Sequence, residues 1–327
     1  MEYKNLYLKG INEIVEKEDY TQFYRFPNDL KQHLESAGFA NENLHGCEIR
    51  FIYEEEVLLT LKSLINKSHV VIYFGDFQLG VYEVNTEPTT IKIKNPFRKE
   101  EITNLNKQKL GFLPNLVRIK LFRKITLVDI LGKYSLPKAS DMPKNNIIAY
   151  GTSITEGYYS HYADITYPQL VAQAINYDLE NLAMNGTCFI EKAYVDYLLT
   201  KNADLYILSI SINMLEQNYE LNVFKERVKY LLKKINEINP YAKVITISIY
   251  PSYREFRLVE NALYDTSGSN KFREILENES KKYENVAFLK GEEVLSFKNL
   301  TTDLLHPGHY GMFEIAHNII NKLKKYD

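Results

Sequence analysis

The pattern of apolar and polar positions divides the chain into two parts with different periods. In the first part, Cys47, Ile49, Phe51 and Tyr53 alternate with mostly polar residues, and this period of two predicts a strand with one buried face. Further runs of strand length lie at 57–64, 69–79, 89–95, 116–122 and 125–132. Short strands rich in β-branched and aromatic residues, with Gly, Asn or Pro at the breaks, are typical of an antiparallel β-sandwich.

From Asn146 onward, apolar runs alternate with segments of helical spacing. The runs lie at 146–153, 180–186, 203–213, 243–250 and 285–291. Helical spacing is clearest for Phe224, Val228, Leu231, Leu232 and Ile235. Strands that alternate with helices imply βαβ units, and therefore a parallel sheet covered by helices on both faces. Reactive groups in such a sheet collect at the carboxyl ends of the strands.

A segment with two prolines separates the two parts. Residues 133–145 contain Pro137 and Pro143 and have little apolar content, which is typical of a linker. The length of 327 residues also fits two domains better than one. We therefore predict an amino-terminal β-sandwich-like domain at 1–140 and an α/β domain at 143–327.

Charge and composition argue against several classes of protein. The 40 Lys and Arg residues nearly balance the 42 Asp and Glu residues, so the net charge of −2 gives no field that would attract nucleic acid. No stretch approaches the roughly 18 apolar residues of a membrane-spanning helix, and residues 1–20 lack the apolar region of a secretory signal. Cys47 and Cys188 lie far apart, which argues against a disulfide framework or a zinc cluster. We expect a soluble, cytoplasmic protein with no nucleic-acid or membrane partner.

Candidate reactive residues follow the apolar runs of the second part. The first run ends in Gly-Thr-Ser, and a serine at a sharp strand-to-helix turn exposes its hydroxyl beside the N–H groups of the next helix. Taken alone, Ser153 is better explained as a helix N-cap. Gly186 follows the second run and could bring its N–H close to a bound oxygen, or be an ordinary turn glycine. Asn213 follows the third run and could donate its amide to an oxyanion or cap a helix.

An acid–histidine pair near the carboxyl end could activate such a serine. A serine hydroxyl needs an adjacent base at neutral pH, and an imidazole oriented by a carboxylate supplies one. Asp303 precedes His306 by three residues in a segment whose Pro-Gly pair marks a loop before the last helical pattern. Two other acid–histidine pairs share this spacing: Glu42 with His45, and Glu314 with His317. Spacing does not separate the three pairs, but position in the predicted fold favours Asp303 and His306.

Four features follow one another along the chain: the Gly-Thr-Ser turn, Gly186, Asn213 and the pair of Asp303 and His306. In this order they resemble the sequence blocks of the SGNH (GDSL-type) hydrolase family. The resemblance covers the second predicted domain and implies a flavodoxin-like sheet and hydrolysis of acyl esters without a metal or another cofactor. It assigns the nucleophile to Ser153 and the rest of a catalytic triad to His306 and Asp303. It places an oxyanion hole at the N–H of Ser153, the N–H of Gly186 and the side chain of Asn213.

The chain departs from the family pattern at two places. Gly-Thr-Ser replaces the usual Gly-Asp-Ser, which leaves the nucleophile intact. The usual Gly-x-Asn-Asp is Ser211-Ile212-Asn213-Met214, which keeps the asparagine but loses the flanking Gly and Asp. A β domain before the hydrolase domain is also similar to the SGNH subgroup that includes some carbohydrate esterases.

Several residues near the predicted site could contact a substrate. The candidates are Thr152, Tyr158, Tyr253 and Arg254, with Arg257 close behind. Aromatic and arginine side chains pack against sugars or bind anions, but a polar loop edge is the simpler explanation for this set. The lysines and arginines between positions 97 and 124 are likewise explained more simply by a solvated sheet edge than by a surface for an anionic polymer.

The favoured hypothesis is a serine esterase that hydrolyses a small O-acyl ester, with an O-acetylated carbohydrate as the expected substrate. An O-acyltransferase would use the same residues with a sugar hydroxyl as acceptor. A non-catalytic carbohydrate-binding protein could also have retained the fold. The acyl length, the alcohol and the oligomeric state stay open at this point.

Overall fold

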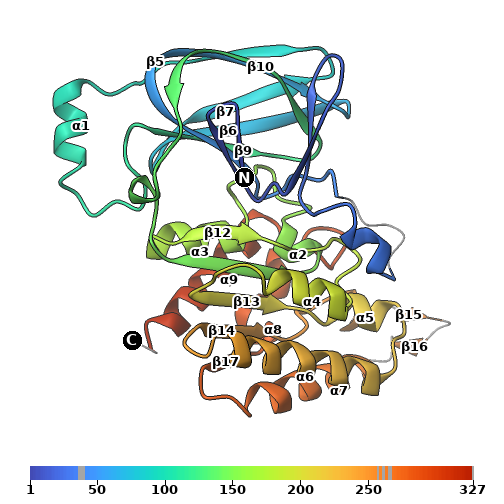
Figure 1. Cartoon of the computed structure of the whole chain (residues 1–327). Helices are drawn as coiled ribbons and strands as arrows, with labels where there is room; N and C mark the ends of the chain where they lie inside the picture. The colour runs from blue at the N-terminus through green and yellow to red at the C-terminus, as the bar shows by residue number, and fades with distance from the viewer. Residues whose placement is uncertain (36–40, 256–257, 260–261, 264–266, 326–327) are drawn as a thin grey trace.

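The chain folds into an antiparallel β domain followed by an α/β domain with a parallel sheet (Figure 1). The computed structural model describes residues 1–35, 41–255, 258–259, 262–263 and 267–325. This architecture confirms the predicted fold class. Among the described helices, none is long and apolar enough to cross a membrane.

The β domain consists of short strands joined by turns. Its elements are β1 (Glu2–Tyr3), β2 (Leu6–Lys9), β3 (Glu13–Glu16), β4 (Thr21–Tyr24), a 3₁₀ turn (Leu30–His33), β5 (Glu48–Ser63), β6 (Lys67–Phe74), β7 (Phe77–Asn85), β8 (Thr89–Ile93), α1 (Lys99–Leu105), β9 (Leu116–Leu121), β10 (Ile125–Ser135) and a second 3₁₀ turn (Ala139–Asp141). The pairings among these strands are antiparallel. Cys47, Ile49 and Phe51 are at most 1% exposed, as predicted, but Glu48 and Arg50 on the opposite face are also buried, at 3% and 1%. This part of β5 is therefore covered on both faces and not on one, because its polar face forms ion pairs with Asp178 and other charged residues.

One long strand, β5, connects two parts of this sheet. Its first half pairs with β9, and its second half pairs with β8 and β10. The sequence pattern predicts two strands here, separated at residues 54–56. These residues are three glutamates, and because no Gly, Pro or Asn ends the strand among them, the strand continues. The predicted strand at 69–79 is instead divided into β6 and β7 by a turn at Gly75, which has a φ of +60°.

The α/β domain has a parallel sheet in the order β12-β11-β13-β14-β17. Its strands are β11 (Asn146–Gly151), β12 (Asp178–Asn181), β13 (Leu205–Ser209), β14 (Lys243–Ile247) and β17 (Val286–Leu289), with a small hairpin of β15 (Leu258–Val259) and β16 (Ala262–Leu263). Its helices are α2 (Ser153–Glu156), α3 (Tyr167–Ile175), α4 (Lys192–Leu198), α5 (Ile212–Glu216), α6 (Leu221–Ile238), α7 (Ser267–Ser280), α8 (Gly291–Val294) and α9 (His309–Leu323), with 3₁₀ turns at Tyr253–Glu255 and Phe297–Asn299.

Helices cover both faces of the parallel sheet, as the alternation of strands and helices predicts. Residues of α4, α6 and α7 pack with Ile148 and Tyr206 on one face, whereas residues of α3 and α9 pack with Ile147 and Ile207 on the other. The apolar positions of α6 are fully buried: Phe224, Val228, Leu231, Leu232 and Ile235. Because all five strands point the same way, the loops at their carboxyl ends meet at one edge of the sheet.

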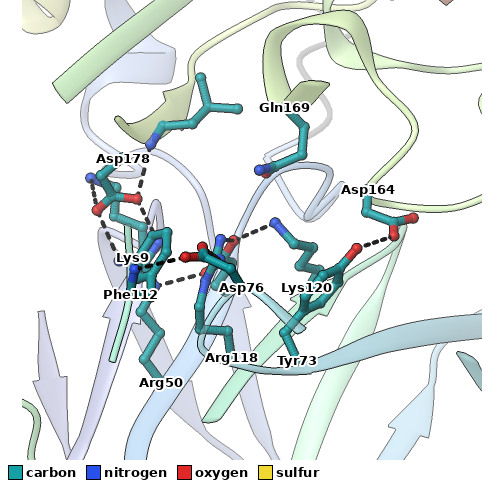
Figure 2. A network of polar contacts seen from close by, with 12 residues as sticks. Lys9, Arg50, Tyr73, Asp76, Phe112, Arg118, Lys120, Asp164, Gln169 and Asp178 are labelled. Carbon is teal, nitrogen blue, oxygen red and sulfur yellow. Dashed lines mark hydrogen bonds and ion pairs between the residues drawn. The ribbon is translucent and has the colours of Figure 1, made fainter. Parts of the chain in front are cut away.

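Buried ion pairs join the β domain to β12, the edge strand of the parallel sheet (Figures 1 and 2). Asp178 in β12 accepts two hydrogen bonds from the guanidinium of Arg50, at 2.7 and 2.8 Å, and lies 3.1 Å from Nζ of Lys9. On the β-domain side, Glu48 accepts hydrogen bonds from the side chains of Arg50, Arg118 and Lys120. We refer to these six residues together as the Asp178 network: Lys9, Glu48, Arg50, Arg118, Lys120 and Asp178.

Candidate active site

Ser153 lies at the turn between β11 and α2, at the carboxyl end of β11, the second strand of the parallel sheet. The turn is tight because Gly151 has no side chain: a Cβ there would lie 2.2 Å from Oγ1 of Thr155 and 2.7 Å from the carbonyl oxygen of Ser209. Ser153 is the first residue of α2, so its N–H belongs to the first turn, where helical N–H groups have no partner within the helix. The side chain is 8% exposed.

The structure brings Ser153, His306 and Asp303 into one chain of hydrogen bonds. Oγ of Ser153 lies 2.8 Å from Nε2 of His306, and Nδ1 of His306 lies 2.7 Å from Oδ2 of Asp303. The residues come from the two ends of the α/β domain: Ser153 follows its first strand, and the other two precede its last helix. The imidazole is therefore held between a hydroxyl and a carboxylate, which is the arrangement that activates a serine nucleophile.

Asp303 is held in place by its own loop. Its Oδ1 accepts hydrogen bonds from Oγ1 of Thr301 and from the N–H groups of Leu305 and His306, at 2.7, 2.9 and 3.0 Å. Burial opposes its ionisation, but these bonds and the bond from the His306 ring outweigh burial and lower the pKa of Asp303 to about 2. Asp303 is therefore ionised at neutral pH and can stabilise a protonated His306.

Gly186, on the loop after β12, and Asn213, in the first turn of α5, lie at the same edge of the sheet. Gly186 has a φ of +72°, and a Cβ built on it would meet no atom within 4 Å, so its surroundings are open. Oδ1 of Asn213 accepts a hydrogen bond from the N–H of Cys188 at 3.2 Å. This bond ties Asn213 to the loop of Gly186 and leaves the Nδ2 donor of its amide directed away from Cys188.

A side chain of the β domain reaches behind the nucleophile. Nη1 of Arg25 donates to Oε1 of Glu156, the last residue of α2, at 3.0 Å. Nη2 of Arg25 donates to the carbonyls of Asn181 and Ala183, at 2.7 and 2.9 Å, in the segment that leads to the Gly186 loop. One buried guanidinium therefore contacts both the helix of Ser153 and the segment of Gly186.

Two further β-domain residues surround Glu156. Nδ2 of Asn43 donates to Oε1 of Glu156 at 3.1 Å, and Nδ1 of His45 lies 4.0 Å from Oε2. That Oε2 and both ring nitrogens of His45 are buried and make no hydrogen bond with any described residue. Burial raises the pKa of Glu156 to about 7, against the lowering effect of Arg25. We refer to Arg25, Asn43, His45 and Glu156 as the Glu156 cluster.

The predicted substrate contacts occupy different environments. Tyr158 is 42% exposed, and its ring centroid lies 6.2 Å from that of His306. Thr152 is buried, with an Oγ1 that makes no hydrogen bond with the described residues. Tyr253 Oη and Arg254 Nε both donate to Oε1 of Glu216 at 2.8 Å, which holds these two side chains on α5. Arg257 lies outside the described residues.

Comparison with known families agrees with this arrangement of loops on a parallel sheet. The model of the GDSL-like lipase/acylhydrolase family matches residues 144–324. The chain belongs to the GDSL-like lipase/acylhydrolase family. The match includes all the residues that the sequence blocks identified, from Ser153 to His306. No curated protein sequence matches the chain.

Solved structures with the same fold cover both domains of this GDSL-like protein. A salicylyl-acyltransferase from a tetracycline biosynthetic pathway is 14% identical, with a TM-score of 0.78 over 99% of this chain and 95% of that chain. An acetyl xylan esterase from Butyrivibrio proteoclasticus is 14% identical, with a TM-score of 0.57 over 100% and 96%. A family two carbohydrate esterase from Clostridium thermocellum is 13% identical, with a TM-score of 0.57 over 87% and 93%. The β domain is therefore part of a recurring two-domain architecture.

The structure places two further residues at the site. Tyr159 belongs to the aromatic residues that follow Ser153 in the sequence, and its ring lies over His306 with centroids 4.5 Å apart. Arg25 was not singled out by the sequence. Arg25 has no motif around it, because its role depends on contacts between domains. Among the described residues, no group of three His, Cys, Asp or Glu side chains is arranged to hold a metal ion.

Proposed function

We propose that this protein is a serine esterase that hydrolyses short O-acyl esters, with O-acetyl groups on a carbohydrate as its substrate class. The observation that carries the proposal is the hydrogen-bonded series of Ser153, His306 and Asp303 within a GDSL-like fold. Carbohydrate esterases with the same two-domain fold support a sugar as the alcohol. The division into domains at 1–140 and 143–327 is supported by the gap between the end of β10 and the start of β11.

The geometry supports a two-step mechanism. His306 accepts the proton of Ser153 as Oγ attacks the ester carbonyl, and Asp303 stabilises the resulting imidazolium. The oxyanion is stabilised by the N–H groups of Ser153 and Gly186 and by the amide of Asn213. The carbon–oxygen bond to the alcohol then breaks as His306 gives its proton to the leaving oxygen. Water repeats the sequence on the acyl-enzyme and releases the acid.

A small cavity between the chain neighbours of the triad and the carboxyl ends of β13 and β14 supports a short acyl group. It has room for about one water-sized group and is lined by Ile154, Ile212 and Leu305, the chain neighbours of Ser153, Asn213 and His306. A methyl group fits such a space, whereas a longer chain does not. We expect the rate with 4-nitrophenyl esters to fall from acetyl to octanoyl, and Leu305→Ala to shift the preference toward butanoyl. A preference of the unchanged enzyme for octanoyl would contradict the acetyl assignment.

The nucleophile and base are tested by substitution. Ser153→Ala and His306→Ala should each lower kcat for 4-nitrophenyl acetate by roughly 10³-fold or more, because these residues act as a unit. A fluorophosphonate should label the parent and not Ser153→Ala. His317→Ala is the matched control, since His317 is an exposed histidine of α9 with the same acid spacing. Parent-like turnover in either triad variant would refute the esterase mechanism.

Acyl transfer is a second candidate, because a salicylyl-acyltransferase shares the fold over 99% of this chain. The two reactions differ only in the group that attacks the acyl-enzyme. Product analysis with and without added carbohydrate distinguishes them. Hydrolysis releases free acid at the same rate in both cases, whereas transfer yields an acylated sugar.

A further inference from the structure

A cleft lies between the two domains next to the triad. It has a volume of about 460 Å³ and is lined by residues 67–69 and 122–123 of the β domain and by residues 158–162, the loop that follows α2. A volume of several hundred Å³ is typical of a site for a small organic ligand. The cleft is therefore large enough for a monosaccharide, in contrast to the small acyl cavity.

The cleft adjoins the residue that protonates the leaving group. Tyr158 and Tyr159 line the cleft, and their ring centroids lie 6.2 and 4.5 Å from that of His306. The cleft therefore borders the imidazole through the rings of these two tyrosines. The small cavity assigned to the acyl group has a different lining, so we assign the cleft to the alcohol part of the ester.

Stacked rings form part of the cleft wall. Phe122 lies between His45 and His69, with centroid distances of 4.3 Å on both sides, and Tyr162 packs edge-on against His69 at 5.3 Å. Both faces of Phe122 are therefore covered, and the half-buried ring of Tyr162 is the aromatic surface that this wall offers to a ligand. Burial lowers the pKa of His69 to about 4, so this ring is uncharged at neutral pH. The wall suits a ring-shaped ligand.

The charged groups that line the cleft are cationic. Lys67 is partly compensated, because its Nζ lies 3.0 Å from Glu83. Arg123 is exposed, lies over the ring of Phe122 at 5.3 Å and forms no ion pair with any described carboxylate. Its φ of +57° is a left-handed conformation that Gly or Asn adopts more readily, so an arginine at this turn has a conformational cost. Among the described residues that line the cleft, none is Asp or Glu.

We propose that the alcohol bound in this cleft is a sugar carrying an acid group, with its anionic oxygens on the guanidinium of Arg123 and its ring against Tyr162. The inference rests on the proposed esterase function and specifies its substrate class. A guanidinium binds a carboxylate or a phosphate with two parallel hydrogen bonds, so sugar acids and sugar phosphates share the required chemistry.

The test compares acetylated sugars that differ in charge. We would measure kcat/KM for an O-acetylated methyl glucuronoside, an O-acetylated glucose 6-phosphate and an O-acetylated methyl glucoside. The parent should prefer at least one charged sugar over the neutral one, mainly through KM, and the preference should weaken with salt. Arg123→Gln should lower the charged-to-neutral ratio at least tenfold. Lys124→Gln, whose lysine is bound to Glu42 at 2.8 Å, should leave the ratio unchanged.

A measurement of equilibrium binding tests the charged sugar independently of the esterase reaction. The acetylated methyl glucuronoside and the acetylated glucose 6-phosphate would be titrated into Ser153→Ala and into Ser153→Ala combined with Arg123→Gln. We expect at least tenfold weaker binding of the preferred sugar to the double variant. Equal binding to both proteins, or no preference of the parent for either charged sugar, would overturn the proposal even if 4-nitrophenyl acetate is hydrolysed. If the unchanged protein does not hydrolyse 4-nitrophenyl acetate, that result argues against the proposed esterase function instead.

Discussion

Two buried polar groups join the domains, and they differ in how completely their hydrogen bonds are satisfied. In the Asp178 network, every buried side-chain nitrogen and oxygen has a partner among the described residues (Figure 2). In the Glu156 cluster, three buried atoms have none. The satisfied network lies along β12, whereas the unsatisfied cluster contacts the helix of the nucleophile. From this comparison we predict that the Asp178 network maintains the domain arrangement and that the Glu156 cluster positions the candidate site residues Ser153 and Gly186.

The carboxylates of the two groups also differ in how well nearby positive charges stabilise their ionised form. Burial opposes the ionisation of Asp178, but Arg50 and Lys9 hold its pKa well below the usual range. Arg118, Arg50 and Lys120 do the same for Glu48. These carboxylates are fixed in the charged state over most of the pH range. Glu156 changes charge near neutral pH, because a single arginine does not offset its burial.

The largest expected effect is on stability, in the satisfied network. Arg50→Met removes the guanidinium that both Asp178 and Glu48 bind and leaves two buried carboxylates undercompensated. We expect a loss of about 3–5 kcal/mol in the free energy of unfolding, measured with urea, because breaking a buried ion pair costs this much. The folded fraction should keep its kcat.

The matched control for this prediction is an exposed ion pair. Lys133 binds Glu55 at 2.8 Å, but both side chains are more than 60% exposed. Lys133→Met should leave the urea midpoint unchanged, since exposed pairs contribute little. Equal effects of the two substitutions would contradict a structural role for the Asp178 network.

The next effect is on catalysis, in the unsatisfied cluster. Arg25→Met frees α2 and the carbonyls of Asn181 and Ala183, so Ser153 and Gly186 lose their common support. We expect kcat for 4-nitrophenyl acetate to fall by roughly 10- to 100-fold with little change in KM, which corresponds to about 1.4–2.7 kcal/mol. Arg25→Lys should recover part of the rate, because lysine can reach Glu156 but lacks the second nitrogen.

The control for this prediction is Arg50→Met, and kcat of both variants is measured at a temperature at which both are folded. If both substitutions lower kcat by the same factor, a general loosening of the domain interface explains the effect. If Arg25→Met raises KM and leaves kcat unchanged, Arg25 supports substrate binding instead. Only a selective loss of kcat agrees with a positioning role.

The sequence could predict the α/β fold and could place five candidate site residues at one edge of the sheet, because both depend on local signals. Apolar runs of strand length located the parallel strands, and parallel strands deliver the residues that follow them to one edge of the sheet. This is why Ser153, Gly186, Asn213, Asp303 and His306 could be assigned from short blocks far apart in the chain. The boundaries of β5 were predicted less well, because the charged residues in its middle interrupt the apolar pattern without ending the strand.

The contacts between domains could not be predicted from the sequence. Arg25 and Glu156 are 131 positions apart and belong to different domains. No periodicity relates such positions, and a buried arginine looks like any other arginine until its partners are known. The interdomain cleft could not be predicted for the same reason, because its two walls come from separate domains.

The smallest effect concerns the pH dependence of stability. Burial raises the pKa of Glu156 to about 7 in the folded chain, above its ordinary value of 4.5. The folded state therefore binds more protons than the unfolded state between these values, and Glu156 contributes stability that is fully present below about pH 4.5 and lost as pH rises to about 7. In Glu156→Gln this contribution is absent. Between pH 8 and pH 6, the parent should gain about 1.3 kcal/mol relative to the variant.

Urea unfolding of both proteins at several pH values measures this difference. His45 lies beside Glu156, and burial together with the charges of Arg25 and Arg123 lowers its pKa to about 3, so its contribution declines as pH falls below 6.5. His45 is present in both proteins, and the comparison between them isolates Glu156. Parallel stability curves would mean that Glu156 stays ionised at pH 6. The Glu156 cluster would then resemble the Asp178 network, and the contrast between the two groups would be confined to the hydrogen bonds of their buried atoms.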